Sequence, residues 1–238
     1  MLFARWIDNF DCGYETEWYH VIKDEAFDIT ALKAKRRYEI NKGLKNYRIQ
    51  IINPKEYPEN LFEIIIAAYS SYPSKYRPKL NKLDFIRNLD SWCANDITVL
   101  GAFDSKNSKL CGFVYLVNCG DYISYSVHRV IPNEEKKGIN AALVYGVLVY
   151  FQRLENCKYV TDGERAVRHE TKFQDYLMKY FGFRRAYCRL NIVYNPCVKP
   201  IVSLLYPFRK LIYKFNSINF LHNVYCVLEQ ERIRRSFL

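Results

Sequence analysis

The chain has 238 residues, of which 50% are hydrophobic and 16% aromatic, with 21 Tyr and 15 Phe. This composition excludes an intrinsically disordered chain, and the length suffices for one domain with extensions or for two small domains. The formal net charge of +11 predicts attraction to anionic partners, namely nucleotide cofactors, nucleic acid or acidic lipid headgroups, and does not choose among them.

The first predicted elements follow from hydrophobic periodicity and turn residues. In order, they are a strand over 17–23, a strongly basic helix over 29–46, a strand over 47–53, and consecutive helices over 58–72 and 82–95. The basic helix indicates either a solvated face or a surface that contacts an anionic substrate or tRNA.

Three strands separated by turn residues come next, over 96–104, 109–119 and 121–131. Their spacing predicts an antiparallel meander. The chain then continues with a helix over 140–154, a strand over 157–162, a helix over 169–181 and a strand over 183–194.

After residue 195 the sequence is punctuated by proline, aromatic and basic, which predicts two or three appended helices. We therefore expect an N-terminal flank over 1–46, a core over 47–195 and a helical C-terminal extension over 196–238. The aromatic and basic extension fits either ordinary packing or contact with a membrane surface.

The cysteines and the N-terminus bear on the compartment. The eight cysteines include no CxxC pair and have no histidines nearby, so no metal site and no redox dithiol is predicted. The N-terminal residues lack the continuous apolar core of a secretory signal, and no apolar run is long enough to span a bilayer. With reduced cysteines, these features predict a cytoplasmic protein.

Two local motifs stand within this order of elements. A predicted strand ends at residues 130–132 (Val-Ile-Pro), and five residues later come 138–140 (Gly-Ile-Asn). A helix opened by the polar Thr171 ends in residues 181–183 (Phe-Gly-Phe). Over about 47–194 this pattern resembles the GNAT superfamily of acyltransferases, and the longer context is more loosely similar to FemAB-type peptidyltransferases.

The resemblance implies an α/β (α+β) fold, with a GNAT-like mixed sheet flanked by helices, an N-terminal basic helix and a helical C-terminal extension. It implies acyl-CoA or acetyl-CoA as the donor, bound where backbone amides meet the positive end of a helix. Aminoacyl-tRNA is the alternative donor that the FemAB similarity implies. The implied donor-binding residues are Arg129, Val130, Ile131, Lys136, Lys137, Gly138, Ile139, Asn140 and Thr171.

Transfer to an amine also needs a base. Asp162, Glu164 and His169 lie close together in sequence at a strand-to-helix crossing, and His169 titrates nearest neutrality. The alternative interpretation is that they are ordinary turn or capping residues. His128, within a predicted strand, faces either a cleft or the core.

Four residues depart from the family pattern, one of them Lys136 at a position that is often Gly. Glu135 stands where Arg or Gln is usual, Asn140 where Gly or Ala is usual, and Met178 where many relatives have a tyrosine as leaving-group acid. The other three departures support the alternative of a catalytically inactive GNAT-fold binding protein, and the charge supports that of a tRNA- or nucleic-acid-binding module. The leading hypothesis is an N-acyltransferase acting on a small-molecule or glycan amine, with a sugar or cell-envelope precursor as one candidate acceptor.

Overall fold

The computed structural model describes residues 2–72, 77–167 and 172–237. The chain divides into two compact units. Unit 1 comprises Met1–Ile22, Gly163–Lys179 and Phe183–Leu238, and unit 2 comprises Lys23–Asp162 and Tyr180–Gly182. The candidate site lies in unit 2.

Unit 2 is built on a mixed sheet. Its strands are β3 (Tyr47–Ile52), β4 (Ile97–Asp104), β5 (Leu110–Asn118), β6 (Tyr122–Val130) and the start of β7 (Tyr159–Glu164). Strands β3 to β6 pair antiparallel in sequence order, which confirms the predicted meander, and β7 pairs parallel to β6.

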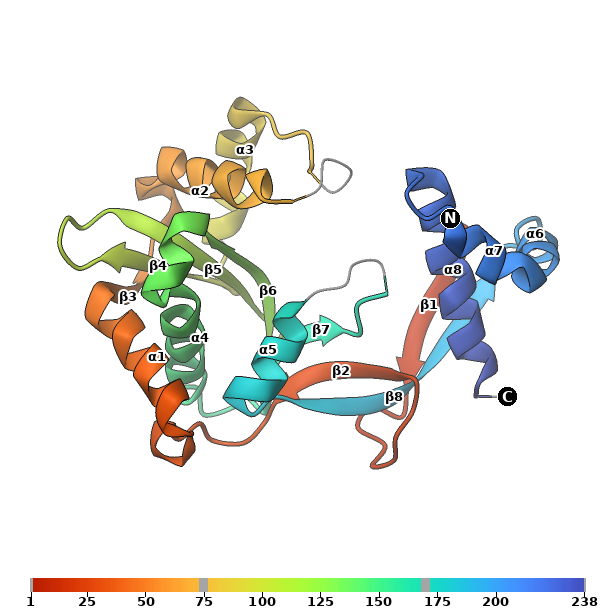
Figure 1. The fold of residues 1–238 in the computed structure, drawn as a ribbon, viewed down its shortest axis with the longest axis horizontal. Coiled ribbons are helices and arrows are strands. Elements are labelled where there is room, and N and C mark those ends of the chain that lie inside the picture. The colour runs from red at the N-terminus through yellow and green to blue at the C-terminus, as the bar shows by residue number, and fades with distance from the viewer. Residues whose placement is uncertain (1, 73–76, 168–171, 238) are drawn as a thin grey trace. The chain divides into compact units, whose positions relative to one another are not determined.

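Helices cover both faces of this sheet. Helices α1 (Ala34–Asn46) and α4 (Ile139–Phe151) lie on one face, and α2 (Pro58–Ser70) and α3 (Lys82–Asn88) on the other (Figure 1). The alternation of side chains along β5 explains this, because successive residues point to opposite faces. Gly112 faces Ile139 of α4, whereas Phe113 packs into the cluster of α2.

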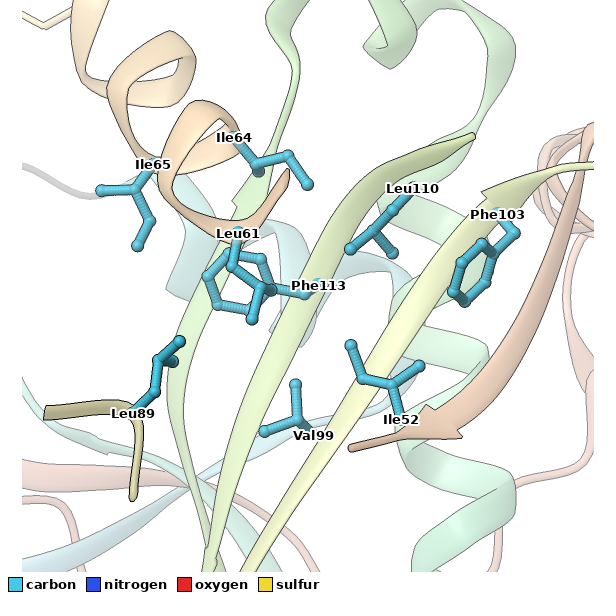
Figure 2. Packing of buried hydrophobic residues seen from close by; sticks show 9 residues of the cluster. All are labelled: Ile52, Leu61, Ile64, Ile65, Leu89, Val99, Phe103, Leu110 and Phe113. Carbon is cyan, nitrogen blue, oxygen red and sulfur yellow. The ribbon is translucent and has the colours of Figure 1, made fainter. Parts of the chain in front are cut away.

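The core between the sheet and α2 is aliphatic and aromatic. Figure 2 shows Phe113 at its centre with Leu61 and Ile64 from α2. The other members shown are Ile52, Ile65, Leu89, Val99, Phe103 and Leu110. Helix α4 is apolar on nearly every side, because it is buried between the sheet and α1.

Unit 1 has β8 (Arg184–Tyr194) between two antiparallel neighbours, β1 (Phe3–Asp8) and β2 (Trp18–Lys23). Helix α8 (Asn219–Arg235) packs on β8 through a cluster that includes Ile233 and Leu190. The remaining helices with residues in this unit are α5 (Lys172–Phe181), α6 (Lys199–Leu205) and α7 (Arg209–Lys214).

The structure confirms the predicted fold class and differs from the predicted elements in three places, one of which is that the helix predicted over 82–95 ends at Asn88 and is followed by a 3-10 helix over Leu89–Cys93. Strand β1 was not predicted, because most of its side chains are exposed and the alternation that marks a strand is missing. The basic helix begins at Ala34, since Asp28 caps a separate 3-10 turn over Ile29–Ala31 and Leu32 is extended. None of the described helices is both long enough and apolar enough to cross a membrane.

The division expected from sequence follows composition, whereas the two units follow contacts. Helix α1, expected in a separate flank, packs on α4 within unit 2. Helix α8, expected in a separate extension, packs on β8 within unit 1.

Candidate functional site

The parallel strands β6 and β7 stay paired for only three residues. The last pair is Ser124 with Thr161. Strand β6 runs on to Val130, and it remains paired with β5 up to Gly112 opposite Val130. The two parallel strands therefore part after Ser124, while the other edge of β6 stays in the sheet.

Backbone geometry decides which amides point to the parted edge. The Ile131 N–H donates to the Cys111 carbonyl at 2.9 Å, so this pair is hydrogen-bonded within the β5–β6 ladder. Hydrogen-bonded and non-hydrogen-bonded pairs alternate in an antiparallel ladder. The N–H groups of His128 and Val130 consequently point away from β5, and those of Arg129 and Ile131 point toward it. Of the three backbone amides expected beside the donor, only that of Val130 is directed to the parted edge.

The N-terminus of α4 lies at the end of this edge. Residues Pro132–Lys137 form a 3-10 turn, and Gly138 follows in the left-handed conformation with φ of 88°. Gly138 precedes α4 and has no side chain to cap the first amides. The 13-residue helix therefore presents the amides of Ile139, Asn140 and Ala141 at the positive end of its dipole. Such an end binds anions.

The acidic residues of the turn are neutralised or point to solvent. Glu134 accepts a hydrogen bond from the Tyr47 hydroxyl and pairs with Lys137 at 2.8 Å. Burial, and then the bond to Glu134, raise the pKa of Tyr47 above its ordinary value, so the tyrosine remains the donor. Glu135 is exposed. These two contacts of Glu134 reduce the negative charge that it would present to an anion at the start of α4.

The basic helix α1 holds the turn in place. A Cβ built on Gly138 would lie 3.0 Å from the Gly43 nitrogen, and one built on Gly43 would lie 2.4 Å from the Gly138 carbonyl oxygen. Beside this backbone contact, the Lys42 ammonium donates to the Lys136 carbonyl at 2.8 Å. Gly138 is therefore needed for helix packing, whatever else it contacts.

A hydrogen-bonded chain links β6 to α4. The Tyr125 hydroxyl lies 2.6 Å from His128 Nδ1, and His128 Nε2 lies 2.8 Å from Asn140 Oδ1. Because an amide oxygen only accepts, Nε2 carries the proton and Nδ1 accepts from Tyr125. Burial lowers the pKa of His128 to about 4, so the ring is neutral near pH 7. His128 thus holds the Asn140 side chain toward β6.

The hydrogen bonds that join Tyr125, His128 and Asn140 were not predicted, because they depend on a β-bulge. Tyr125 and His128 are three residues apart, which puts them on opposite faces of a regular strand. The register shifts between the pairs Tyr115–Val127 and Leu116–Tyr125, leaving Ser126 extra. The bulge brings both side chains to the α4 face.

The Arg129 side chain lies on the other face of β6, toward α2. One guanidinium nitrogen donates to the Tyr69 hydroxyl at 2.9 Å, another donates to the His128 carbonyl at 2.8 Å, and the carbon of the group lies 4.9 Å from the Tyr69 ring centroid. Among the described residues no carboxylate lies within ion-pairing distance of Arg129. Arg36, also half-buried in unit 2, pairs with Glu39.

The three candidate bases, Asp162, Glu164 and His169, do not lie together in one described site. Asp162 is half-buried on β7 and directly follows Thr161, the last residue paired with β6. Glu164 belongs to unit 1, where it pairs with Arg5 at 2.8 Å. His169, like the expected donor-binding Thr171, lies outside the described residues. Within 2–72, 77–167 and 172–237, no group of three or more His, Cys, Asp or Glu side chains is arranged to hold a metal ion.

Comparison with known proteins supports the fold. No protein-family model matches the sequence, and no curated protein matches it. Among solved structures, FemX aligns with a TM-score of 0.57 at 9% identity over 79% of this chain and 63% of that chain. A conserved protein of unknown function from Bacteroides thetaiotaomicron gives 0.53 at 13% identity, covering 80% and 62%. The L-PGS of Bacillus licheniformis gives 0.51 at 12% identity, covering 85% and 66%.

This chain spans less than two thirds of the length of each of these three proteins. At such identities the likeness concerns the fold. The chain has a GNAT-like fold, as the sequence resemblance implies.

Proposed function

We propose that this chain is a GNAT-fold N-acyltransferase that moves an acyl group from acyl-CoA or acetyl-CoA to an amine. The observation that carries the proposal is the parting of β6 from β7 after Ser124, next to the uncapped N-terminus of α4. Together these place a directed backbone N–H and the positive end of a helix at one edge of the sheet.

The donor's phosphates would be held by the amides of Ile139, Asn140 and Ala141, with the exposed Lys136 side chain adding positive charge. The Val130 N–H would donate to the acyl oxygen as negative charge develops on it. A bound acyl-CoA supplies an activated thioester carbonyl. Lys137 already pairs with Glu134, so its role is to hold the turn.

Asp162 is the base that we propose, because it stands where β7 leaves β6. In the transfer, a bond forms between the amine nitrogen and the acyl carbon, and the amine proton passes to the carboxylate. The bond from the acyl carbon to sulfur breaks, and CoA leaves with that electron pair as a thiolate, which takes up the proton from Asp162. Asp162→Asn should lower kcat at least about 100-fold with little change in KM. Asp121→Asn, which alters an exposed ion pair with Lys158, is the control and should retain activity.

Binding of the donor is tested with CoA and acetyl-CoA. At a CoA concentration of about 100 times Kd, mass action adds about 2.7 kcal/mol, and Tm should rise by about 5–11 °C. Asn140→Asp keeps the acceptor for His128 and suits the helix dipole, but its charge repels phosphate, so CoA affinity should fall at least about 10-fold. Asn88→Asp, exposed on α3, makes the same charge change and should bind CoA like the wild type.

Two results would reject this assignment. If neither CoA nor acetyl-CoA shifts Tm of the wild type, acyl-CoA is not the donor. If Asn140→Asp binds CoA as tightly as Asn88→Asp, the donor does not use the start of α4.

Aminoacyl-tRNA is a second candidate donor, supported by the Asn140 side chain. His128 holds this side chain at the first turn of α4, where a diphosphate needs close approach to the amides. The net charge of +11 suits an RNA donor. A mobility-shift assay should show tighter binding of aminoacylated tRNA than of the same tRNA without its amino acid. Equal binding would indicate nonspecific attraction and reject this donor.

The surroundings of the Arg129 side chain indicate which chemical groups the acceptor carries. A half-buried guanidinium whose described partners are a carbonyl, a hydroxyl and a ring retains its full charge and spare N–H donors. The arrangement supports an acceptor that carries a carboxylate or phosphate group. Phenylglyoxal, which modifies arginine, should label Arg129 less when inorganic phosphate or acetate is present, while the exposed Arg48 keeps its labelling. Unchanged labelling of Arg129 with both anions would reject this role.

A further inference from the structure

The segment from α6 to the start of α8 exposes an unusual number of large apolar side chains. Eight of the nineteen exposed large hydrophobic residues of the described chain fall in this segment, so exposed apolar side chains are more frequent here than in other stretches of the same length. They are Ile201, Leu204, Phe208, Leu211, Tyr213, Phe215, Ile218 and Phe220. We call this set the apolar patch. Phe220 is 73% exposed and Leu204 is 71% exposed, so water covers most of each side chain.

The same segment carries only positive charge. No Asp or Glu occurs from Asn195 through Leu228, whereas Lys199, Arg209, Lys210 and Lys214 lie among the apolar residues. The segment thus combines apolar and basic side chains without the acidic ones that a surface exposed to water would mix with them.

Contacts within unit 1 hold the segment as a fixed surface. The Tyr213 ring of α7 lies 4.8 Å from the Tyr225 ring of α8. The Tyr206 ring has the Arg209 guanidinium at 4.5 Å and the Arg235 guanidinium at 3.9 Å. Because these anchors fix the backbone, the apolar patch presents its side chains without folding them into a core.

The chemistry of the segment indicates which kind of partner it binds. A protein partner is matched by apolar side chains with charges of both signs, and RNA is matched by basic side chains with few exposed aliphatic ones. A bilayer surface with acidic headgroups matches both parts of this segment, since aliphatic and aromatic side chains enter the boundary of the acyl chains while lysine and arginine contact the headgroups.

We propose that the apolar patch and its four basic residues dock unit 1 on an anionic membrane surface, as a peripheral contact and not a span. This inference stands independently of the proposed transferase activity, because it concerns other residues and another unit.

The test is co-sedimentation of the full chain with vesicles. The wild type should bind vesicles of equal parts phosphatidylcholine and phosphatidylglycerol at least about 10-fold more tightly than vesicles of phosphatidylcholine alone, and added salt should weaken binding. The double variant Phe208→Ser with Phe220→Ser should bind the mixed vesicles at least about 10-fold more weakly. Lys210→Glu with Lys214→Glu should have a similar effect through charge.

Matched controls separate these effects from general changes in surface character. Leu83→Ser removes an apolar side chain whose exposed fraction lies between those of Phe208 and Phe220, and Lys106→Glu reverses an exposed charge, both in unit 2. Both controls should bind like the wild type. Equal binding of the wild type to the two kinds of vesicle would overturn the proposal. So would a dimer that the Phe208 and Phe220 variant dissociates, because the patch would then be covered by a second copy.

The vesicle assay and the CoA assay test the two proposals independently of each other. Loss of vesicle binding with normal CoA binding leaves the transferase proposal standing, and the reverse result leaves the membrane contact standing.

Discussion

The contact between α1 and the turn before α4 predicts that Gly43→Ala destabilises the protein. The new Cβ would lie 2.4 Å from the Gly138 carbonyl oxygen and 3.0 Å from the Ala142 Cβ. The closer of these atoms belongs to the backbone, so no side-chain rotation relieves the clash. Helix α1 and the turn must move apart.

The magnitude follows from three opposing effects. Alanine is favoured over glycine within a helix by about 1 kcal/mol. Against this, overpacking costs about 1–3 kcal/mol. Separation also weakens the bonds from Lys42 to the Lys136 carbonyl and from Asn46 to the Lys137 carbonyl, now 2.8 and 3.1 Å long, each worth about 0.5–1.5 kcal/mol. The net loss is about 3 kcal/mol, which lowers Tm by about 6–12 °C.

Urea denaturation measures this change in the free energy of unfolding. Lys35→Ala, exposed on the same helix, is the control and should stay within about 0.5 kcal/mol of the wild type. Combining Gly43→Ala with Lys42→Ala should cost less than the sum of the two, because the first change already weakens the Lys42 bond. A Gly43→Ala protein as stable as the wild type would refute the reasoning, since helix propensity would then outweigh the backbone contact.

Two further predictions concern the titratable groups of His128, which is half-buried, and Glu231, which is buried. The pKa of His128 in the folded chain is about 4, below its ordinary value of 6.5. Its contribution to the free energy of unfolding is therefore fully present above pH 6.5, and it is lost between pH 6.5 and 4 because the unfolded chain takes up the proton first. In His128→Gln, about 3 kcal/mol of this loss in the free energy of unfolding should be absent. Measurements of unfolding at successive pH values test this. Parallel pH profiles for the variant and the wild type would contradict it. Glu231 is 2% exposed and pairs with Arg234 and Arg235 at 2.8 and 2.7 Å. Glu231→Gln should therefore destabilise the chain by about 3 kcal/mol in urea, and a loss below about 0.5 kcal/mol would show that the pairs contribute little.

The order of elements in unit 2 was accessible from sequence because its signals are local. The alternation over 96–131 and its turn residues are read within a few positions, and they predicted the meander that β4, β5 and β6 form. The apolar character of 140–154 likewise predicted α4. The glycine before α4 marked the position of the turn, and the structure gives Gly138 the left-handed conformation that the turn requires.

The candidate site depended on relationships between distant residues. The neutral ring of His128 follows from its burial, and its contact with Tyr125 follows from the bulge in β6. The sequence carries no local sign of either. Arg129 was expected to contribute a backbone amide, yet ladder alternation turns that amide toward β5 and its side chain toward Tyr69.

The sequence by itself determined most of the strands and helices, β1 excepted, and where the glycine turn falls. Only the tertiary structure decided that β7 leaves β6 after Ser124, that α1 meets the turn through Gly43, and which amides face the parted edge. The physical reason is that periodicity and turn conformation depend on neighbours along the chain. The direction of a backbone N–H in a sheet depends on register with a strand brought alongside by folding.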